Sequence, residues 1–245
     1  MTSKQKELKC LLIAYILGQY VTESCWKIES INTMKIAVYS SKGSAGKTPI
    51  STNIALDKNF CIGTNEAFHI YDSLLDDDQL IALDTEEPFP SELKEMDIDI
   101  VFDLAGSISK LAVSITSALA MADVVIVPIY NEYKSLVAGL NTIHQIQQYN
   151  SNIIVVATKL QKGKRETFTG DWRQSNDYQN IANAVRDKFA EHNIPVLPLK
   201  YSKAFDSIFE QQKSIQQLMQ SSALAKYNYR EVAVQFDDLY QHIGI

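Results

Sequence analysis

The sequence contains little cysteine and histidine. Its three cysteines (Cys10, Cys25 and Cys61) are an odd number and lack the spacing of a metal site, so they predict neither a disulfide framework nor bound zinc. The four histidines are scattered along the chain, which gives no basis for a Ser-His-Asp triad. This cysteine usage is typical of the reducing cytoplasm, and we therefore expect a cytoplasmic protein.

The sequence also lacks an internal repeat, a low-complexity tract and an apolar run long enough to span a membrane. The apolar stretch at residues 8–17 lies beside several lysines and resembles a signal peptide, but it is too short for a spanning helix. We interpret residues 1–33 as an extension outside the core, with a membrane-touching helix as the alternative. Residues 34–245 are long enough for one α/β domain with a sizeable core.

Positive charge is not in excess, because 23 Lys and Arg stand against 29 Asp and Glu. The net charge of −6 argues against a protein that coats nucleic acid, although it leaves room for a local basic patch. Such a patch occurs at Lys159–Arg173, where basic residues are interleaved with Phe168 and Trp172. This combination fits contact with a phosphate backbone and stacking on bases, or simply a solvated charged loop.

The strongest local signal is a loop of small residues between a strand and a helix. The apolar strand Ile36–Tyr39 leads into Ser41–Gly46, and Lys47 and Thr48 close the loop before a helix-forming segment. Consecutive backbone N–H groups at such a helix start form a concave site for phosphate. Lys47 would reach the β- and γ-phosphates of a nucleotide, and the Thr48 hydroxyl would bind Mg²⁺.

A second signal is an apolar strand that ends in Asp103 and is followed by Leu-Ala-Gly and Ser107. A carboxylate at this position would accept hydrogen bonds from a Mg²⁺-bound water and from the Thr48 hydroxyl. An ordinary strand-terminal aspartate is the alternative. The phosphate loop about fifty residues upstream favours the functional interpretation.

The alternation of strands and helices from Met34 to Leu199 predicts one doubly wound, mainly parallel sheet with helices on both faces. We interpret the acidic clusters at 76–78 and 84–87 as a solvated face. The predicted strands include Phe60–Ile62, Ala122–Pro128, Ile153–Ala157 and Ile194–Leu199, and the predicted helices include Ser107–Met121, Glu132–Gln148 and Arg230–Ile243.

These motifs carry a family resemblance that covers about residues 34–245. Lys42–Thr48 (KGSAGKT) resembles the deviant Walker A box K-G-G-x-G-K-[ST] of the ParA/MinD ATPases, which include plasmid partition and plasmid stability ATPases. Asp103 and the following Leu-Ala-Gly resemble the Walker B element, and Ala122–Pro128 resembles the strand after it. Ser41 replaces the leading glycine of the general motif, Ser44 replaces the second glycine of the family box, and Pro49 stands where that family commonly has Thr.

The resemblance implies a site for ATP and Mg²⁺. The implied nucleotide-binding residues are Lys42, Gly43, Ser44, Ala45, Gly46, Lys47, Thr48 and Pro49, with Thr48 and Asp103 at the metal. Thr158, Lys159, Pro198 and Lys200 match positions near the base. The implied catalytic residues are Lys42, Lys47, Asp103 and Glu66.

The resemblance also implies a mode of action. Lys42 matches the signature lysine that crosses into the partner's site in an ATP-dependent homodimer. Only Glu66 remains of the two carboxylates that orient the attacking water, because Thr64 occupies the other position, so slow hydrolysis is expected. We expect a slow, partner-stimulated ATPase that acts as a dimeric switch in DNA or plasmid partition or stability. Its further partners would be non-specific DNA and a DNA-binding adaptor protein, with a membrane not expected.

Two alternatives remain open at this point. The first is a nucleotide-binding adaptor with little turnover, which the departures at Ser41, Ser44 and Thr64 suggest. The second is a metabolic P-loop synthetase that acts on a small organic substrate, which the acidic net charge slightly favours.

Overall fold

The computed structural model describes residues 33–106 and 112–245. The interpretation of the N-terminal segment as an extension therefore falls, apart from Thr33, outside the described residues. The predicted start of a helix at Ser107 falls outside them as well.

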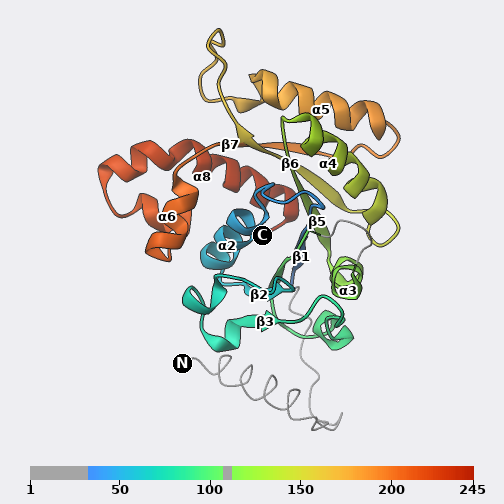
Figure 1. Cartoon of the computed structure of the whole chain (residues 1–245). Helices are drawn as coiled ribbons and strands as arrows, with labels where there is room; N and C mark the ends of the chain where they lie inside the picture. Colours follow the sequence, from blue (N-terminus) through green and yellow to red (C-terminus); the bar gives the residue numbers. More distant parts are fainter. Residues whose placement is uncertain (1–32, 107–111) are drawn as a thin grey trace.

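A single sheet of seven parallel strands forms the centre of the molecule (Figure 1). Its order is β3-β2-β4-β1-β5-β6-β7, so β1 and β4 lie side by side in the interior. This arrangement confirms the predicted doubly wound, parallel α/β fold. The strands are β1 (Lys35–Val38), β2 (Cys61–Thr64), β3 (Leu80–Ala82), β4 (Ile100–Asp103), β5 (Val124–Tyr130), β6 (Ile153–Leu160) and β7 (Val196–Lys200).

Helices cover both faces of the sheet because successive strand residues point to opposite sides. Along β1, Ile36 and Val38 pack into the apolar layer formed with α2 (Lys47–Lys58), α6 (Ala204–Gln211), α7 (Ile215–Met219) and α8 (Ala223–Ile243). Ala37 and the adjacent Tyr39 pack into the opposite layer, formed with α3 (Val113–Met121), α4 (Tyr133–Ile146) and α5 (Asn176–Lys188). The short 3-10 helices are η1 (Tyr71–Ser73), η2 (Asp77–Gln79), η3 (Ser91–Lys94) and η4 (Trp172–Gln174).

The predicted elements occur with shifted ends. Within the described residues, the helix that follows β4 begins at Val113, because Ala112 has an extended backbone and the Ser114 N–H bonds to the carbonyl of Thr85. The last helix begins at Ala223 rather than Arg230, since the Ser222 side chain caps its first turn by accepting from the N–H of Ala225. As predicted, this helix packs its apolar side against the core. No helix in the described ranges has the length and apolar character needed to cross a membrane.

Acidic side chains at the starts of neighbouring strands fix the beginning of β1. The N–H of Met34 donates to Asp99 Oδ1 at 2.8 Å, and the N–H of Lys35 donates to Asp123 Oδ2 at 2.7 Å. The Lys35 side chain is buried, which lowers the pKa of its ammonium, while Asp123 and Asp99 oppose that shift. Because these acids precede β4 and β5, their bonds set the register of β1 between those two strands.

A close contact between β2 and β4 depends on a glycine. Gly63 lies opposite Phe102, and a Cβ at Gly63 would lie 2.5 Å from the Phe102 ring. Phe102 in turn packs edge-to-face on Phe89, with ring centroids 4.9 Å apart. Phe89 follows the acidic cluster at 84–87, and the structure buries its side chain under the sheet.

We predict that Gly63→Ala destabilises the protein by about 1–3 kcal/mol, because the added methyl group must displace the buried Phe102 ring. Urea denaturation would measure this loss. Gly43→Ala is the matched control, since no atom lies within 4 Å of its added Cβ, and it is expected to change the free energy of unfolding by less than about 0.5 kcal/mol. Equal stability of the two variants would contradict the prediction.

Candidate nucleotide site

The loop from Ser40 to Gly46 connects β1 to α2 at the carboxyl edge of the sheet. Two of its residues have left-handed backbones: Gly46 with φ 100° and Ser44 with φ 58°. Glycine adopts this conformation readily, whereas other L-residues lose roughly 1–2 kcal/mol in it. The family's glycine at the position of Ser44 therefore has a conformational reason, and serine adopts the same turn here with some strain.

The loop presents unpaired backbone donors. Within the part of the chain that the structure describes, the N–H groups of residues 43–48 make no hydrogen bond to another residue. Gly46 caps α2 without a side-chain bond, and the first turn of this helix contains no acidic residue. The free N–H groups and the positive end of the helix dipole thus converge on one small concave region, which favours an anion.

Three neighbours hold the loop in place. Ser41 Oγ lies 2.8 Å from Thr142 Oγ1 of α4, and the Ser41 N–H donates to the same hydroxyl. Thr158 Oγ1 of β6 donates to the carbonyl of Ala45 at 2.8 Å. Gly106 lies against the loop backbone, where a Cβ would approach the Ser41 carbonyl to 3.2 Å. The serine that replaces the leading glycine is therefore anchored through its own side chain.

Asp103 ends β4 beside this loop, and its carboxylate is fully buried. Its Oδ2 accepts a hydrogen bond from the Tyr71 hydroxyl at 2.7 Å, and its Oδ1 accepts one from Ser51 Oγ at 3.3 Å. The Thr48 hydroxyl and the Lys47 ammonium lie close enough to stabilise the charge of this carboxylate. The structure thus brings Lys47, Thr48 and Asp103 together, as the sequence predicts.

Burial raises the pKa of Asp103 to about 6 from its ordinary value of 3.8. The Tyr71 hydrogen bond opposes this rise, the charge of Glu66 adds to it, and the contributions of Thr48 and Lys47 oppose it. The hydroxyl groups and the lysine therefore offset only part of the cost of placing a charged carboxylate inside the protein. A cation at this position would lower that cost further.

The strand ends next to Asp103 are linked to it through the main chain. Thr64 Oγ1 donates to the Asp103 carbonyl at 3.0 Å and accepts from the Glu66 N–H at 3.2 Å. The half-buried Glu66 therefore starts the segment that follows β2, near the Asp103 carboxylate. Asn65 is buried, and its Oδ1 accepts from the Ala105 N–H at 2.7 Å.

Several residues of this site were not predicted from the sequence. Ser51, Tyr71 and Thr142 contact the loop or Asp103, and Asn65 bonds to the main chain of Ala105, two residues after Asp103. None of the four belongs to the motifs that identified the site. Ser51 has a local signal, since it lies one helical turn after Lys47 on the same side of α2. The other three come from distant segments that only the folded sheet brings near.

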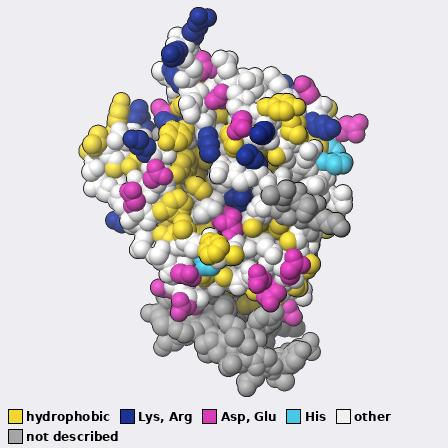
Figure 2. All heavy atoms as spheres, viewed as in Figure 1, with side chains coloured by type: hydrophobic (Ala, Val, Ile, Leu, Met, Phe, Trp, Pro, Cys, Tyr) yellow, Lys and Arg dark blue, Asp and Glu magenta, His cyan; other side chains and the backbone are white. Residues whose placement is uncertain are grey.

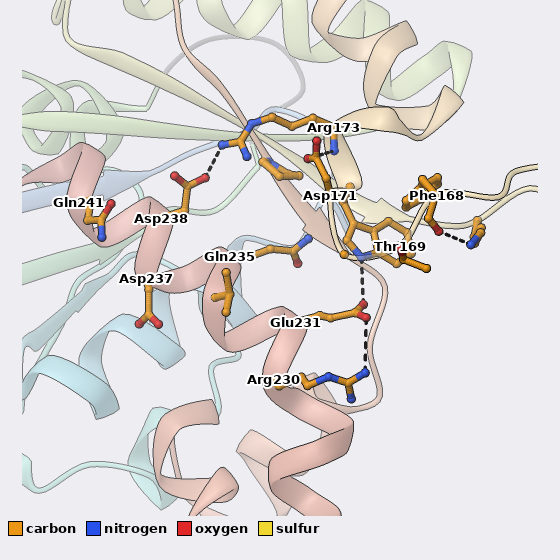
Figure 3. Close-up of a pocket in the computed structure, with 15 residues that line it drawn as sticks. Phe168, Thr169, Asp171, Arg173, Arg230, Glu231, Gln235, Asp237, Asp238 and Gln241 are labelled. Carbon is orange, nitrogen blue, oxygen red and sulfur yellow. Dashed lines mark hydrogen bonds and ion pairs between the residues drawn. The ribbon is translucent and has the colours of Figure 1, made fainter.

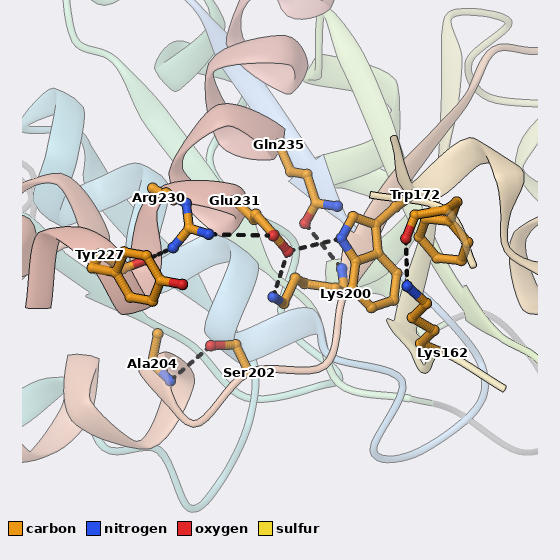
Figure 4. A network of polar contacts seen from close by, with 10 residues as sticks. Lys162, Trp172, Lys200, Ser202, Ala204, Tyr227, Arg230, Glu231 and Gln235 are labelled. Atoms are coloured by element: carbon orange, nitrogen blue, oxygen red, sulfur yellow. Dashed lines mark hydrogen bonds and ion pairs between the residues drawn. The ribbon is translucent and has the colours of Figure 1, made fainter. Parts of the chain in front are cut away.

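The four residues that the sequence predicts near the base of the nucleotide lie in two different environments. Thr158 is buried and bonded to the phosphate loop, whereas Lys159 places its ammonium 4.7 Å from the centroid of the Tyr130 ring. Pro198 and Lys200 lie on β7, three strands from β1 at the edge of the sheet. Lys200 Nζ donates to Glu231 Oε2 at 2.7 Å and lies over the Trp172 ring (Figure 4).

A hollow of about 1220 Å³ lies along this outer edge, between α8 and the segment that precedes α5 (Figure 3). Pro198 lines it together with Trp172, Arg173, Glu231, Gln235 and Asp238, whereas no residue of the phosphate loop does. Its opposite charges are paired across the opening, with Arg173 donating to Asp238 and Lys200 to Glu231. Gln235 Oε1 accepts from the N–H of Lys200 at 3.0 Å, and Tyr178 donates to the carbonyl of Val196 at 2.9 Å.

The sequence matches no family model and no curated protein. The structure does match solved structures. The ATP complex of a Cyanothece McdA variant is 12% identical, with a TM-score of 0.59 and a match over 88% of this chain and 98% of that one. The cell division ATPase MinD of Pyrococcus furiosus is 13% identical, with a TM-score of 0.52 over 84% and 100% of the two chains. The chain has the fold of the ParA/MinD-type P-loop ATPases.

A further match is MinD of Pyrococcus horikoshii in complex with Mg-ADP, at 13% identity and a TM-score of 0.51 over 85% of this chain and 97% of that one. At these identities the likeness concerns the fold alone, so the chemistry has to follow from the side chains. The donor set fits Mg²⁺, because the Thr48 hydroxyl and the Asp103 carboxylate offer the oxygen ligands that this ion prefers. The described residues contain no cluster of three or more His, Cys, Asp or Glu side chains that could hold a metal ion. A Mg²⁺ that is bound partly by phosphate oxygens does not require such a cluster.

The raised pKa of Asp103 predicts that Asp103→Asn stabilises the protein when Mg²⁺ is absent. The folded chain binds this proton more readily than the unfolded chain, so the ionised carboxylate lowers stability at neutral pH. At pH 8 the variant is expected to gain up to about 3 kcal/mol, from a shift of about two pKa units. The gain should shrink as the pH falls through about 6 and vanish below about pH 4.

Thermal unfolding in EDTA at several pH values would measure this effect. Asp84→Asn, which changes an exposed carboxylate, is the matched control and is expected to leave stability unchanged. If the gain in stability of Asp103→Asn did not depend on pH, it would not arise from the cost of burying the ionised Asp103 carboxylate, and the prediction would be wrong.

Proposed function

We propose that the chain binds ATP and Mg²⁺ on the loop 42–48 and hydrolyses the nucleotide slowly, as a dimeric switch in DNA or plasmid partition or stability. The observation that carries the proposal is the convergence of free N–H groups, Lys47, Thr48 and Asp103 at one point of the carboxyl edge. The known structures of this fold support it, since they include an ATP complex of McdA and a Mg-ADP complex of MinD.

Each residue has a defined role in this proposal. The N–H groups of Gly43, Ser44, Ala45 and Gly46 would bind phosphate oxygens, and Pro49 lies in the first helical turn, where no N–H partner is lost. Lys47 would neutralise charge on the β- and γ-phosphates. Thr48 and Asp103 would hold Mg²⁺, which draws negative charge away from the phosphate that is transferred. Thr158, Lys159, Pro198 and Lys200 remain the proposed base-side residues.

Slow turnover follows from the surroundings of Glu66. Among the described residues, Glu66 is the carboxylate whose charge acts on Asp103, and we propose that it orients the attacking water; exposed residues follow it at 67 and 68. A partner that packs on this segment would fix Glu66 and accelerate hydrolysis. A measured ATPase rate that rises with DNA or a partner protein would favour the switch over an adaptor or a synthetase.

Dimerisation is supported by the surface around the site. Lys42 is half-buried in the loop and makes no ion pair with a described residue, so its ammonium is available to a second subunit. Large apolar side chains are exposed in the segments that follow the strands at this same edge: Phe68, Ile70, Val113, Tyr133 and Tyr201. Exposed apolar groups at the edge that carries the site offer a surface on which a second subunit could pack.

We predict that the protein is monomeric without nucleotide and dimeric with ATP or a slowly hydrolysed analogue. Lys42→Ala should bind nucleotide with similar affinity but fail to dimerise, because it removes a cation from the shared interface. Light scattering would measure the mass of both forms. Lys188→Ala, an exposed lysine on α5, is the control and should dimerise normally. An ATP-bound protein that stays monomeric, or a Lys42→Ala variant that still dimerises, would overturn this part of the proposal.

DNA binding is supported by the loop between β6 and α5. This loop projects from the body of the molecule (Figure 1), and Lys and Arg side chains cover its tip (Figure 2). Lys164 and Arg165 are exposed, whereas the nearby Glu166 turns back and accepts from the N–H groups of Asn176 and Gly163, which lowers the pKa of its carboxyl. Lys162 bonds to the Phe168 carbonyl and stabilises the stem. The tip is therefore positive on a protein that is acidic overall.

We predict that the double variant Lys164→Glu and Arg165→Glu weakens DNA binding in the ATP state by at least about tenfold. Because two phosphate contacts are lost, the slope of log affinity against log salt should decrease by about 2. Fluorescence anisotropy with a random-sequence duplex would measure both quantities. The double variant Arg186→Glu and Lys188→Glu changes the net charge equally on α5 and should retain binding. Equal losses in the two variants would show that only net charge matters.

A further inference from the structure

The segment that follows β2 is attached to Asp103 at both of its ends. At its beginning, the Thr64 hydroxyl joins the Asp103 carbonyl to the N–H of Glu66. At its end, the Tyr71 hydroxyl donates to the Asp103 carboxylate at 2.7 Å. Asp103 therefore closes residues 64–71 into a ring of bonds, with its main chain holding one end and its side chain the other.

Tyr71 is built into the core apart from its hydroxyl. Its ring is 1% exposed and belongs to the apolar layer that contains Ile50, Ile54 and Ile62. The hydroxyl lies between α2 and β4, where it bonds to Asp103 and has Thr52 nearby. A rigid ring with one fixed polar atom is suited to hold a carboxylate in one orientation, since the phenol has few alternative positions.

Three residues between these two attachments, at positions 67, 68 and 70, are exposed, whereas Asn65 is buried. Phe68 is 97% exposed and Ile70 is 42% exposed, and Glu66 begins the same stretch. The exposure of Phe68 is typical of a surface that contacts a partner.

We propose that Tyr71 is a positioning residue that sets the Asp103 carboxylate for Mg²⁺ and transmits the occupation of the metal site to residues 66–70. This inference rests on the proposed nucleotide function. With the Tyr71 bond in place, Oδ2 is fixed, and Oδ1 remains directed toward Ser51 on α2, the helix whose Thr48 would hold the metal. When Mg²⁺ and nucleotide bind, the metal would hold the Asp103 carboxylate as well, and the Tyr71 bond would pass this stabilisation to the end of the segment that carries Glu66 and Phe68.

Tyr71→Phe tests the proposal, because it removes one hydroxyl and keeps the ring. Affinity for a fluorescent ADP analogue is measured with Mg²⁺ and with EDTA. The variant is expected to bind in EDTA as the wild type does, while the gain in affinity that Mg²⁺ gives should fall by about tenfold or more, the effect of losing a hydrogen bond to a charged group. Hydrogen exchange of the amides of residues 65–71 is measured in parallel. Mg²⁺ and ADP should slow this exchange in the wild type and leave it unchanged in Tyr71→Phe.

Two further variants separate positioning from a general loss of stability. Tyr178→Phe removes a phenol hydroxyl that bonds to the Val196 carbonyl far from the loop, and it should keep both responses to Mg²⁺. Ser51→Ala removes the other hydroxyl on Asp103, so it should weaken the gain from Mg²⁺ but keep the slowed exchange of residues 65–71.

Three results would overturn the proposal. They are an unchanged gain from Mg²⁺ in Tyr71→Phe, an equal loss in Tyr178→Phe, and wild-type exchange at residues 65–71 that does not respond to Mg²⁺ and ADP. The last measurement decides the question even where Tyr71→Phe does not fold. A wild-type protein that binds no nucleotide at all would refute the proposed function itself, and the binding assay detects that outcome separately.

Discussion

The burial of one carboxylate organises the structure around the site. Asp103 ends an interior strand, and a charge in that position needs donors on every side. The fold supplies them from α2 and from η1, whose side chains meet at the same point. Burial nevertheless raises the pKa of this carboxyl, so its negative charge is only partly stabilised in the metal-free protein. A divalent cation would stabilise that charge further.

Sequence patterns were sufficient to predict the elements that create this site. The phosphate loop and the strand ending at Asp103 are short, local signals, and the runs of Val and Ile in β5 and β6 are typical of strands buried on both faces. The layered α/β fold follows from their alternation with helical segments. Because a parallel sheet brings the ends of its strands to one edge, the approach of Lys47 to Asp103 could also be predicted.

The contacts that complete the site could not be predicted from the sequence. Tyr71 is 32 residues from Asp103, and Thr142 is 101 residues from Ser41, so no local pattern links either pair. The ends of some helices and strands were predicted wrongly for similar reasons. The first turns of α8 expose Leu224 and Tyr227 and therefore lack the apolar spacing that marked the rest of the helix, and β3 is a three-residue edge strand between acidic clusters. Tertiary contacts, rather than propensity, decide these boundaries.

The hydrogen bonds at β7 restrict how copies of this protein can assemble. Alternate residues of this edge strand direct their main chain outward, and each is blocked in a different way: the Val196 carbonyl accepts from Tyr178, Pro198 has no N–H, and the Lys200 N–H is occupied by Gln235. A strand from another chain would find no regular row of donors here with which to extend the sheet. Association of copies of the chain by pairing strands at β7 is thus disfavoured. Association is left to contacts between side chains, and a bound ligand can change the affinity of such contacts.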